Sequence, residues 1–169
     1  MNKLTFDKYT ADDFGNYKQL VKDDEVMKYI SGSGLSEDEA KLKFDSILAV
    51  NSQDSMLGTY KILNAEDVFI GDCKIVRYFS DNVSLEIGYI LKKDFWRLGY
   101  GTLICKKLLD TANQFYPMLD IIGIIDPDNI ASKRLLQKFG FESYFIGFED
   151  NLPTEKLMLK KGKNALDCK

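Results

Sequence analysis

The stretch Phe95-Trp96-Arg97-Leu98-Gly99-Tyr100-Gly101-Thr102 joins two segments of different periodicity. Residues 83–91 before it form a strand-like run, and residues 102–115 after it repeat apolar side chains at helical spacing. Glycine lets a ligand approach the backbone, and the first amides of a helix lack partners and carry the positive end of its dipole. The turn is therefore suited to bind phosphate, although a tight strand-to-helix connection alone explains the same pattern.

Two further motifs accompany this turn. Residues 85–91 read Leu-Glu-Ile-Gly-Tyr-Ile-Leu, and residues 129–141 begin at Asn129 and end in Lys-Phe-Gly-Phe. In this order the three motifs resemble the GNAT superfamily of acetyl-CoA-dependent N-acetyltransferases, and in particular its ribosomal-protein N-acetyltransferase-like (RimJ/RimL-type) branch. The superfamily pattern has Arg or Gln where this chain has Trp96, and Arg97 comes one residue late. A tryptophan at this position is usual in the RimJ/RimL-type branch.

The composition limits the class of protein. The chain has 169 residues, of which 45% are hydrophobic, as expected of one globular domain. Its net charge of -3 gives no sign of the basic face that binds nucleic acid. Histidine is absent, which excludes Ser-His and Cys-His catalysis and most zinc sites, and three widely spaced cysteines imply no disulfide framework. Without a signal-like or membrane-spanning run, we expect a cytoplasmic protein.

The order of the remaining segments predicts an α/β fold. Strand-like runs over residues 56–63, 68–79 and 83–91 predict an antiparallel meander, and the isoleucine-rich run 118–125 predicts a strand covered on both faces. The resemblance implies the GNAT fold, a mixed, mostly antiparallel sheet of about seven strands flanked by helices, with a central parallel pair that splays apart. We expect a single domain over residues 1–160 and a flexible tail over residues 161–169.

The resemblance also implies a site for acetyl-CoA. The pantetheine arm would enter the gap between the splayed strands and pair with the backbone of Tyr89, Ile90 and Leu91. Asn129 caps a helix whether or not a ligand binds, and by resemblance it would also contact the pantetheine or acetyl region. Lys133 would reach the nucleotide phosphate, although a lysine at the start of a helix is often merely solvated. The turn itself would bind phosphate through Arg97, Leu98, Gly99, Tyr100, Gly101 and Thr102.

Glu86 is the first candidate for catalysis. Transfer of an acetyl group to an amine needs a base that removes a proton from the ammonium ion. Glu86 stands in mid-strand with Gly88 as its neighbour on the same face, and a carboxylate there is costly unless it is solvated or paired. Many GNAT members place a catalytic glutamate on this strand. An ion pair with Lys or Arg across the sheet is the alternative explanation.

Ser132 is the second candidate. Many GNAT members carry a tyrosine acid at the position of Leu136, so the usual group that protonates the departing thiolate is missing here. The branch resemblance implies that Ser132 protonates or hydrogen-bonds the sulfur, whereas helix capping or helix packing is the simpler role. Cys105 is expected to pack inward, which argues against an acetyl-cysteine intermediate.

These features predict an acetyl-CoA-dependent N-acetyltransferase that transfers the acetyl group directly to a primary amine. The acceptor is a protein N-terminus, which the branch resemblance favours, or a small amine such as a polyamine or an antibiotic. A catalytically silent, acyl-CoA-binding regulatory module is the rival, because Leu136 and Arg97 depart from the superfamily pattern. No metal, membrane or nucleic-acid partner is expected, and the chain is a monomer or a homodimer.

Overall fold

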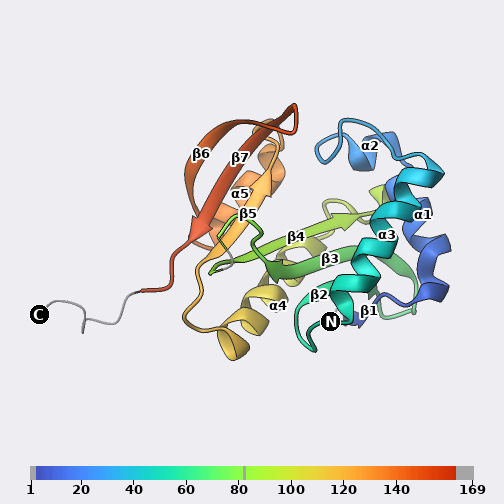
Figure 1. Cartoon of the computed structure of the whole chain (residues 1–169), viewed down its shortest axis with the longest axis horizontal. Coiled ribbons are helices and arrows are strands. Elements are labelled where there is room, and N and C mark those ends of the chain that lie inside the picture. The colour runs from blue at the N-terminus through green and yellow to red at the C-terminus, as the bar shows by residue number, and fades with distance from the viewer. Residues whose placement is uncertain (1–2, 82, 163–169) are drawn as a thin grey trace, which may run out of the picture.

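The computed structural model describes residues 3–81 and 83–162, and most of the predicted tail therefore lies outside the described residues. It contains one seven-stranded sheet with helices on both faces (Figure 1). The strands are β1 (Thr5–Lys8), β2 (Gly58–Leu63), β3 (Phe69–Arg77), β4 (Leu85–Leu91), β5 (Ile121–Ile125), β6 (Glu142–Glu149) and β7 (Leu152–Leu159). The helices are η1 (Ala11–Asp13), α1 (Phe14–Val21), α2 (Asp24–Met27), α3 (Glu37–Asn51), η2 (Lys93–Phe95), α4 (Tyr100–Phe115) and α5 (Ile130–Lys138).

The sheet has the order β1-β2-β3-β4-β5-β7-β6, and β4 and β5 form its one parallel pair within the described residues. These two strands pair only from Leu85 opposite Ile121 to Ile87 opposite Gly123. Beyond this point each continues along its other neighbour, β3 or β7, and the two strands separate. The predicted mixed sheet with a central splayed pair is confirmed.

Several predicted boundaries differ from the observed ones. Strand β5 begins at Ile121 rather than at residue 118, and α4 begins at Tyr100, two residues before the predicted start. Strand β7 includes Pro153, which lacks an N–H group but is tolerated because β7 pairs with β5 only from Glu155 onward. No helix in the described part of the chain is long and apolar enough to span a membrane.

The two faces of the sheet have separate hydrophobic cores. Helices α4 and α5 pack on one face, over a core that includes Ile75, Ile87 and Leu157. Helices α1, α2 and α3 pack on the other face, near β1 to β3, around the aromatic side chains of Tyr9, Tyr17 and Phe44. Strand β4 lies between this second group of helices and the β6–β7 hairpin in Figure 1. On this face of β4, Glu86, Gly88 and Ile90 are half-buried.

Candidate active site

The gap between β4 and β5 exposes backbone groups of β4. The Leu85 amide donates to Asp120 on the β5 side, whereas the Lys92 amide donates to Ile70 on the β3 side. Because these directions alternate along a strand, Tyr89 and Leu91 turn their N–H and C=O groups toward the gap. The Leu91 carbonyl already accepts the Trp96 indole N–H at 2.8 Å. Ile90, predicted with them, turns its backbone groups toward β3 instead.

The predicted phosphate turn opens α4. Gly99 has a φ of 85°, in the region that favours glycine, and a Cβ atom built there would meet nothing within 4 Å. Its carbonyl accepts the Thr102 amide at 3.1 Å, so the amides before Thr102 are the unpartnered donors of a helix start. Exposed Arg97 also has a positive φ, of 60°. This open turn presents free N–H donors, which suit a phosphate group.

The side chain of Tyr89 contacts the first turn of α4 at Gly101 and the first turn of α5 at Ser132. A Cβ atom on Gly101 would lie only 2.7 Å from the Tyr89 hydroxyl, so glycine is required for the ring to pack there. Burial raises the pKa of the Tyr89 phenol, and its hydrogen bond with Ser132 opposes that shift. The phenol therefore stays protonated at neutral pH, and the two residues form a hydroxyl pair on the α4–α5 face.

Glu86 lies on the opposite face of β4. Its carboxylate Oε1 is 2.5 Å from the Lys74 ammonium on β3, and its side chain is 16% exposed. The ion pair across the sheet, which was the alternative explanation for Glu86, is thus present. The Glu86 side chain nevertheless keeps some contact with solvent. Glu86 and the Tyr89–Ser132 hydroxyl pair stand on the two faces of the sheet, with the gap between them.

Helix α5 brings two more predicted residues to the site. The Asn129 side chain accepts the Ser132 amide at 3.1 Å, which is the capping role. This cap uses only Oδ1, so the amide nitrogen can donate elsewhere. Lys133 lies 3.0 Å from Glu155 of β7, a carboxylate with no exposed surface and no hydrogen bond among the described groups. Contact between Lys133 and phosphate stays a prediction, and Glu155 competes for this lysine.

Cys105 is buried against the same core, as predicted. Burial raises the pKa of its thiol to about 11. A protonated, buried thiol is a poor nucleophile, which favours direct transfer over an acetyl-cysteine intermediate.

Asp72, which the sequence analysis did not single out, is buried on β3 two residues before Lys74. It accepts a hydrogen bond from the Tyr9 hydroxyl at 3.0 Å. Burial raises the pKa of its carboxyl to about 7, against the opposing effects of that hydrogen bond and of Lys74. Between its ordinary value of 3.8 and about 7, the folded protein keeps a proton that the unfolded chain releases. The free energy of unfolding therefore decreases as the pH rises through this interval.

We expect Asp72→Asn to remove this dependence and to make the protein more stable than wild type above neutral pH. The gain is at most roughly 4 kcal/mol, from about 1.4 kcal/mol per pKa unit. Denaturant unfolding at several pH values measures it. Asp13→Asn is the control of opposite sign, because hydrogen bonds from Lys61 and Thr10 lower the pKa of Asp13 despite its partial burial. Parallel stability curves for wild type and Asp72→Asn would contradict the assignment.

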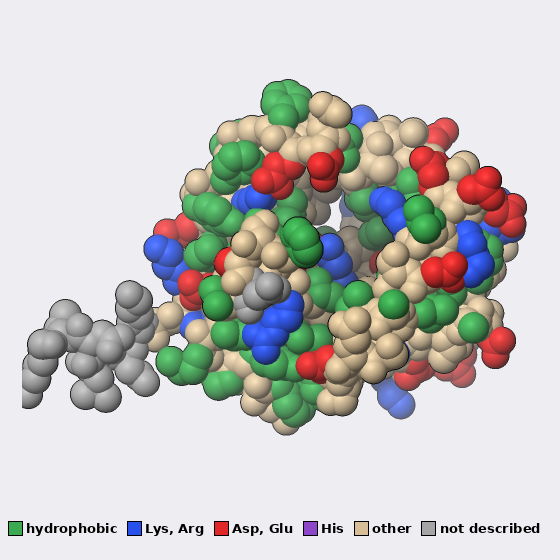
Figure 2. Space-filling model, viewed as in Figure 1, with side chains coloured by type: hydrophobic (Ala, Val, Ile, Leu, Met, Phe, Trp, Pro, Cys, Tyr) green, Lys and Arg blue, Asp and Glu red, His purple; other side chains and the backbone are tan. Residues whose placement is uncertain are grey.

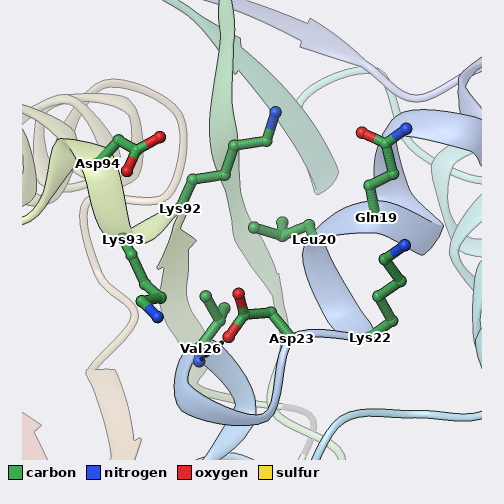
Figure 3. A pocket seen from close by; sticks show the side chains of 8 residues that line it. All are labelled: Gln19, Leu20, Lys22, Asp23, Val26, Lys92, Lys93 and Asp94. Carbon is green, nitrogen blue, oxygen red and sulfur yellow. Dashed lines mark hydrogen bonds between the residues drawn. The ribbon is translucent and has the colours of Figure 1, made fainter.

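The Glu86 side of the sheet is hollowed. Figure 2 shows this face hollowed between the β6–β7 side and the α1–α3 side. A groove of about 360 Å³ lies between α1–α2 and the end of β4 (Figure 3). Its walls carry both signs of charge and include none of the predicted site residues, so we assign it no ligand. The lining residues are Gln19, Leu20, Lys22, Asp23, Val26, Lys92, Lys93 and Asp94.

Lys74 and Asp72 were missed although the sequence carries a signal for them. Strand β3 reads Phe-Ile-Gly-Asp-Cys-Lys-Ile-Val-Arg, where an acid and a base alternate with apolar side chains. Two charged residues on one face of an otherwise buried strand indicate that this face contacts polar groups or solvent. The Tyr89 hydroxyl was also missed, because its contact with Ser132 joins β4 to α5, which lie far apart in the sequence.

Comparisons with known proteins agree with this architecture. A sequence model of the acetyltransferase (GNAT) domain matches residues 3–142. YnaD of Bacillus subtilis, an uncharacterised N-acetyltransferase, is 26% identical over 145 residues, or 85% of this chain and 82% of that protein. The structure of spermidine N-acetyltransferase from Vibrio cholerae with CoA and spermine has a TM-score of 0.75 at 15% identity, over 94% of this chain and 95% of that chain. RimL, a ribosomal alpha-N-protein acetyltransferase in complex with CoA, has a TM-score of 0.76 at 14% identity, over 93% of each chain.

Proposed function

Because the chain belongs to the GNAT acetyltransferase domain family, we propose that it transfers an acetyl group from acetyl-CoA directly to a primary amine. One observation carries this proposal. The gap beyond Ile87 has a carboxylate on one face of the sheet and the Tyr89–Ser132 hydroxyl pair on the other. Acetyl-CoA supplies an acyl thioester, and the protein supplies a base and a proton donor on opposite sides of it.

Glu86 acts on the acceptor side. It takes a proton from the incoming ammonium, which leaves a neutral amine to attack the carbonyl carbon. The amides of Tyr89 and Leu91 face the gap and stabilise the negative charge that develops on the carbonyl oxygen. Lys74 must move away from Glu86 before an external ammonium ion can reach this base, because Lys74 occupies the carboxylate.

The Tyr89–Ser132 hydroxyl pair acts on the side of the departing thiol. Ser132 donates its proton to the sulfur, and its hydrogen bond with the Tyr89 hydroxyl positions Ser132 for this step. Burial raises the pKa of Tyr89, so its phenol stays neutral and adds no negative charge beside the departing thiolate. This arrangement replaces the tyrosine acid that is absent at Leu136.

The turn at Gly99 binds phosphate through its free amides, and Asn129 donates its side-chain amide to the pantetheine or acetyl region. We favour Arg97 over Lys133 as the side chain that binds phosphate, since Lys133 already faces the buried carboxylate of Glu155.

Among acceptors we place a protein N-terminus first, because Trp96 matches the RimJ/RimL-type branch. A polyamine or another small amine is the second candidate.

Calorimetry with acetyl-CoA, followed by a thiol-release assay on the same sample, tests the function. The assay uses peptides with free N-termini and polyamines as acceptors. We expect binding, and release only when an acceptor amine is present. Binding without release on any amine would support a silent acyl-CoA-binding module, and absence of binding would overturn the proposal.

A further inference from the structure

Lys74 lies on the Glu86 face of the sheet, beside the point where β4 and β5 separate. Lys74 on β3 pairs with Gly88 on β4. A Cβ atom on Gly88 would lie 3.4 Å from Cε of Lys74. The lysine stem thus passes over the one position of this strand face that has no side chain. From there its ammonium reaches Glu86 at 2.5 Å.

This position coincides with the mouth of the gap. The parallel pairing of β4 with β5 ends at Ile87 opposite Gly123, so the strands separate from Gly88 onward. The amides of Tyr89 and Leu91 that face the gap follow directly. An amine at the Lys74 position is therefore held by the proposed base, beside the proposed thioester site, on a side chain that is 42% exposed.

We propose that Lys74 is itself an acetyl acceptor, modified in cis when no external amine is bound. This inference rests on the proposed function. Glu86 takes a proton from the Lys74 ammonium, and the neutral nitrogen attacks the thioester carbonyl carbon. A C–N bond forms and the C–S bond breaks, so that the acetyl group of acetyl-CoA passes to lysine. The nitrogen loses its second proton to solvent as the amide forms, and the CoA thiolate gains a proton from Ser132 and leaves as a thiol.

The same geometry separates Lys74 from other paired lysines. Lys61 on β2 is also ion-paired, with Asp13 at 2.7 Å, and its side chain is 22% exposed. It lies two strands away from the gap, because β3 stands between β2 and β4. Lys61 therefore has a carboxylate partner but no access to the thioester, and it serves as a matched control.

The test is the intact mass of the full chain incubated with acetyl-CoA and no added amine, with peptide mapping. We expect one acetyl group on Lys74, formed at a rate independent of protein concentration. Lys74→Arg should abolish the modification, and Lys61→Arg should leave it unchanged. Glu86→Gln should slow it about a hundredfold, within the usual effect of losing a general base.

A second readout needs no turnover. CoA without an acetyl group should protect Lys74, but not Lys61, from an amine-reactive label, because only Lys74 lies at the gap. Unmodified Lys74 in a sample that binds acetyl-CoA and acetylates added amines would overturn this inference and leave the proposed function standing. Modification that spreads over exposed lysines, or that depends on protein concentration, would overturn it as well. A sample that does not bind acetyl-CoA would overturn both.

Discussion

Glu86→Gln should lower kcat by about 10²- to 10⁴-fold, the range typical of a lost general base, while the affinity for acetyl-CoA stays unchanged. The amide keeps the shape of the carboxylate and can still accept a hydrogen bond from Lys74, 2.5 Å away in the wild type. What it loses is the ability to take a proton from the acceptor. Steady-state kinetics at several pH values, with calorimetry of acetyl-CoA binding, measure both parts.

High pH should rescue this variant, because an amine that is already neutral needs no base. Rescue near pH 8 would match an α-amino acceptor, and rescue near about 10.4 would match an aliphatic amine such as lysine. The rescue therefore also reports the class of acceptor.

The main alternative is that Glu86 only balances the charge of Lys74. In that case Lys74→Met should lower turnover as much as Glu86→Gln, and neither variant should recover at high pH. Glu37→Gln is the control for removing a glutamate from an ion pair, because Glu37 contacts Lys18 at 3.0 Å on the exposed surface. We expect that variant to keep the wild-type rate and pH profile.

The sequence predicted the elements of the fold better than their ends. Periodicity shows that residues 83–91 form a strand and that its polar face carries Glu86. It does not show where β4 stops pairing with β5, because that depends on β3 and β7 drawing the two strands apart. The splay was available only through the resemblance to a known family.

The candidate site was predicted in its parts but not in its contacts. Glu86 was expected to be solvated or paired, and its partner Lys74 depends on the register between β3 and β4, which neither strand reveals alone. Glu155, the partner of Lys133, comes from the last described strand, and pairing over that distance along the chain leaves no local pattern. The capping role of Asn129 depends only on nearby residues and is confirmed.

Gly99→Glu should strongly weaken the binding of acetyl-CoA while leaving the protein folded. A side chain at this position has space, since nothing lies within 4 Å of the Cβ position, so the core is undisturbed. The added carboxylate would stand among the free amides at the start of α4 and repel a phosphate by about 2–4 kcal/mol at the effective dielectric of a protein surface. Affinity would then fall roughly 30- to 1,000-fold, at about 1.4 kcal/mol per tenfold.

Backbone strain must be separated from charge in this experiment, because any side chain at a φ of 85° costs about 1 kcal/mol. Gly99→Ala carries the strain without the charge and should lower Tm by only roughly 3 °C with a small loss of affinity. Gly32→Glu adds the same strain and the same charge at a different turn, where φ is 82° and nothing lies within 4 Å of the Cβ position. This variant should bind acetyl-CoA as wild type does. If Gly99→Glu and Gly32→Glu bind acetyl-CoA equally well, the phosphates do not lie at the Gly99 turn, and another set of donors must hold them.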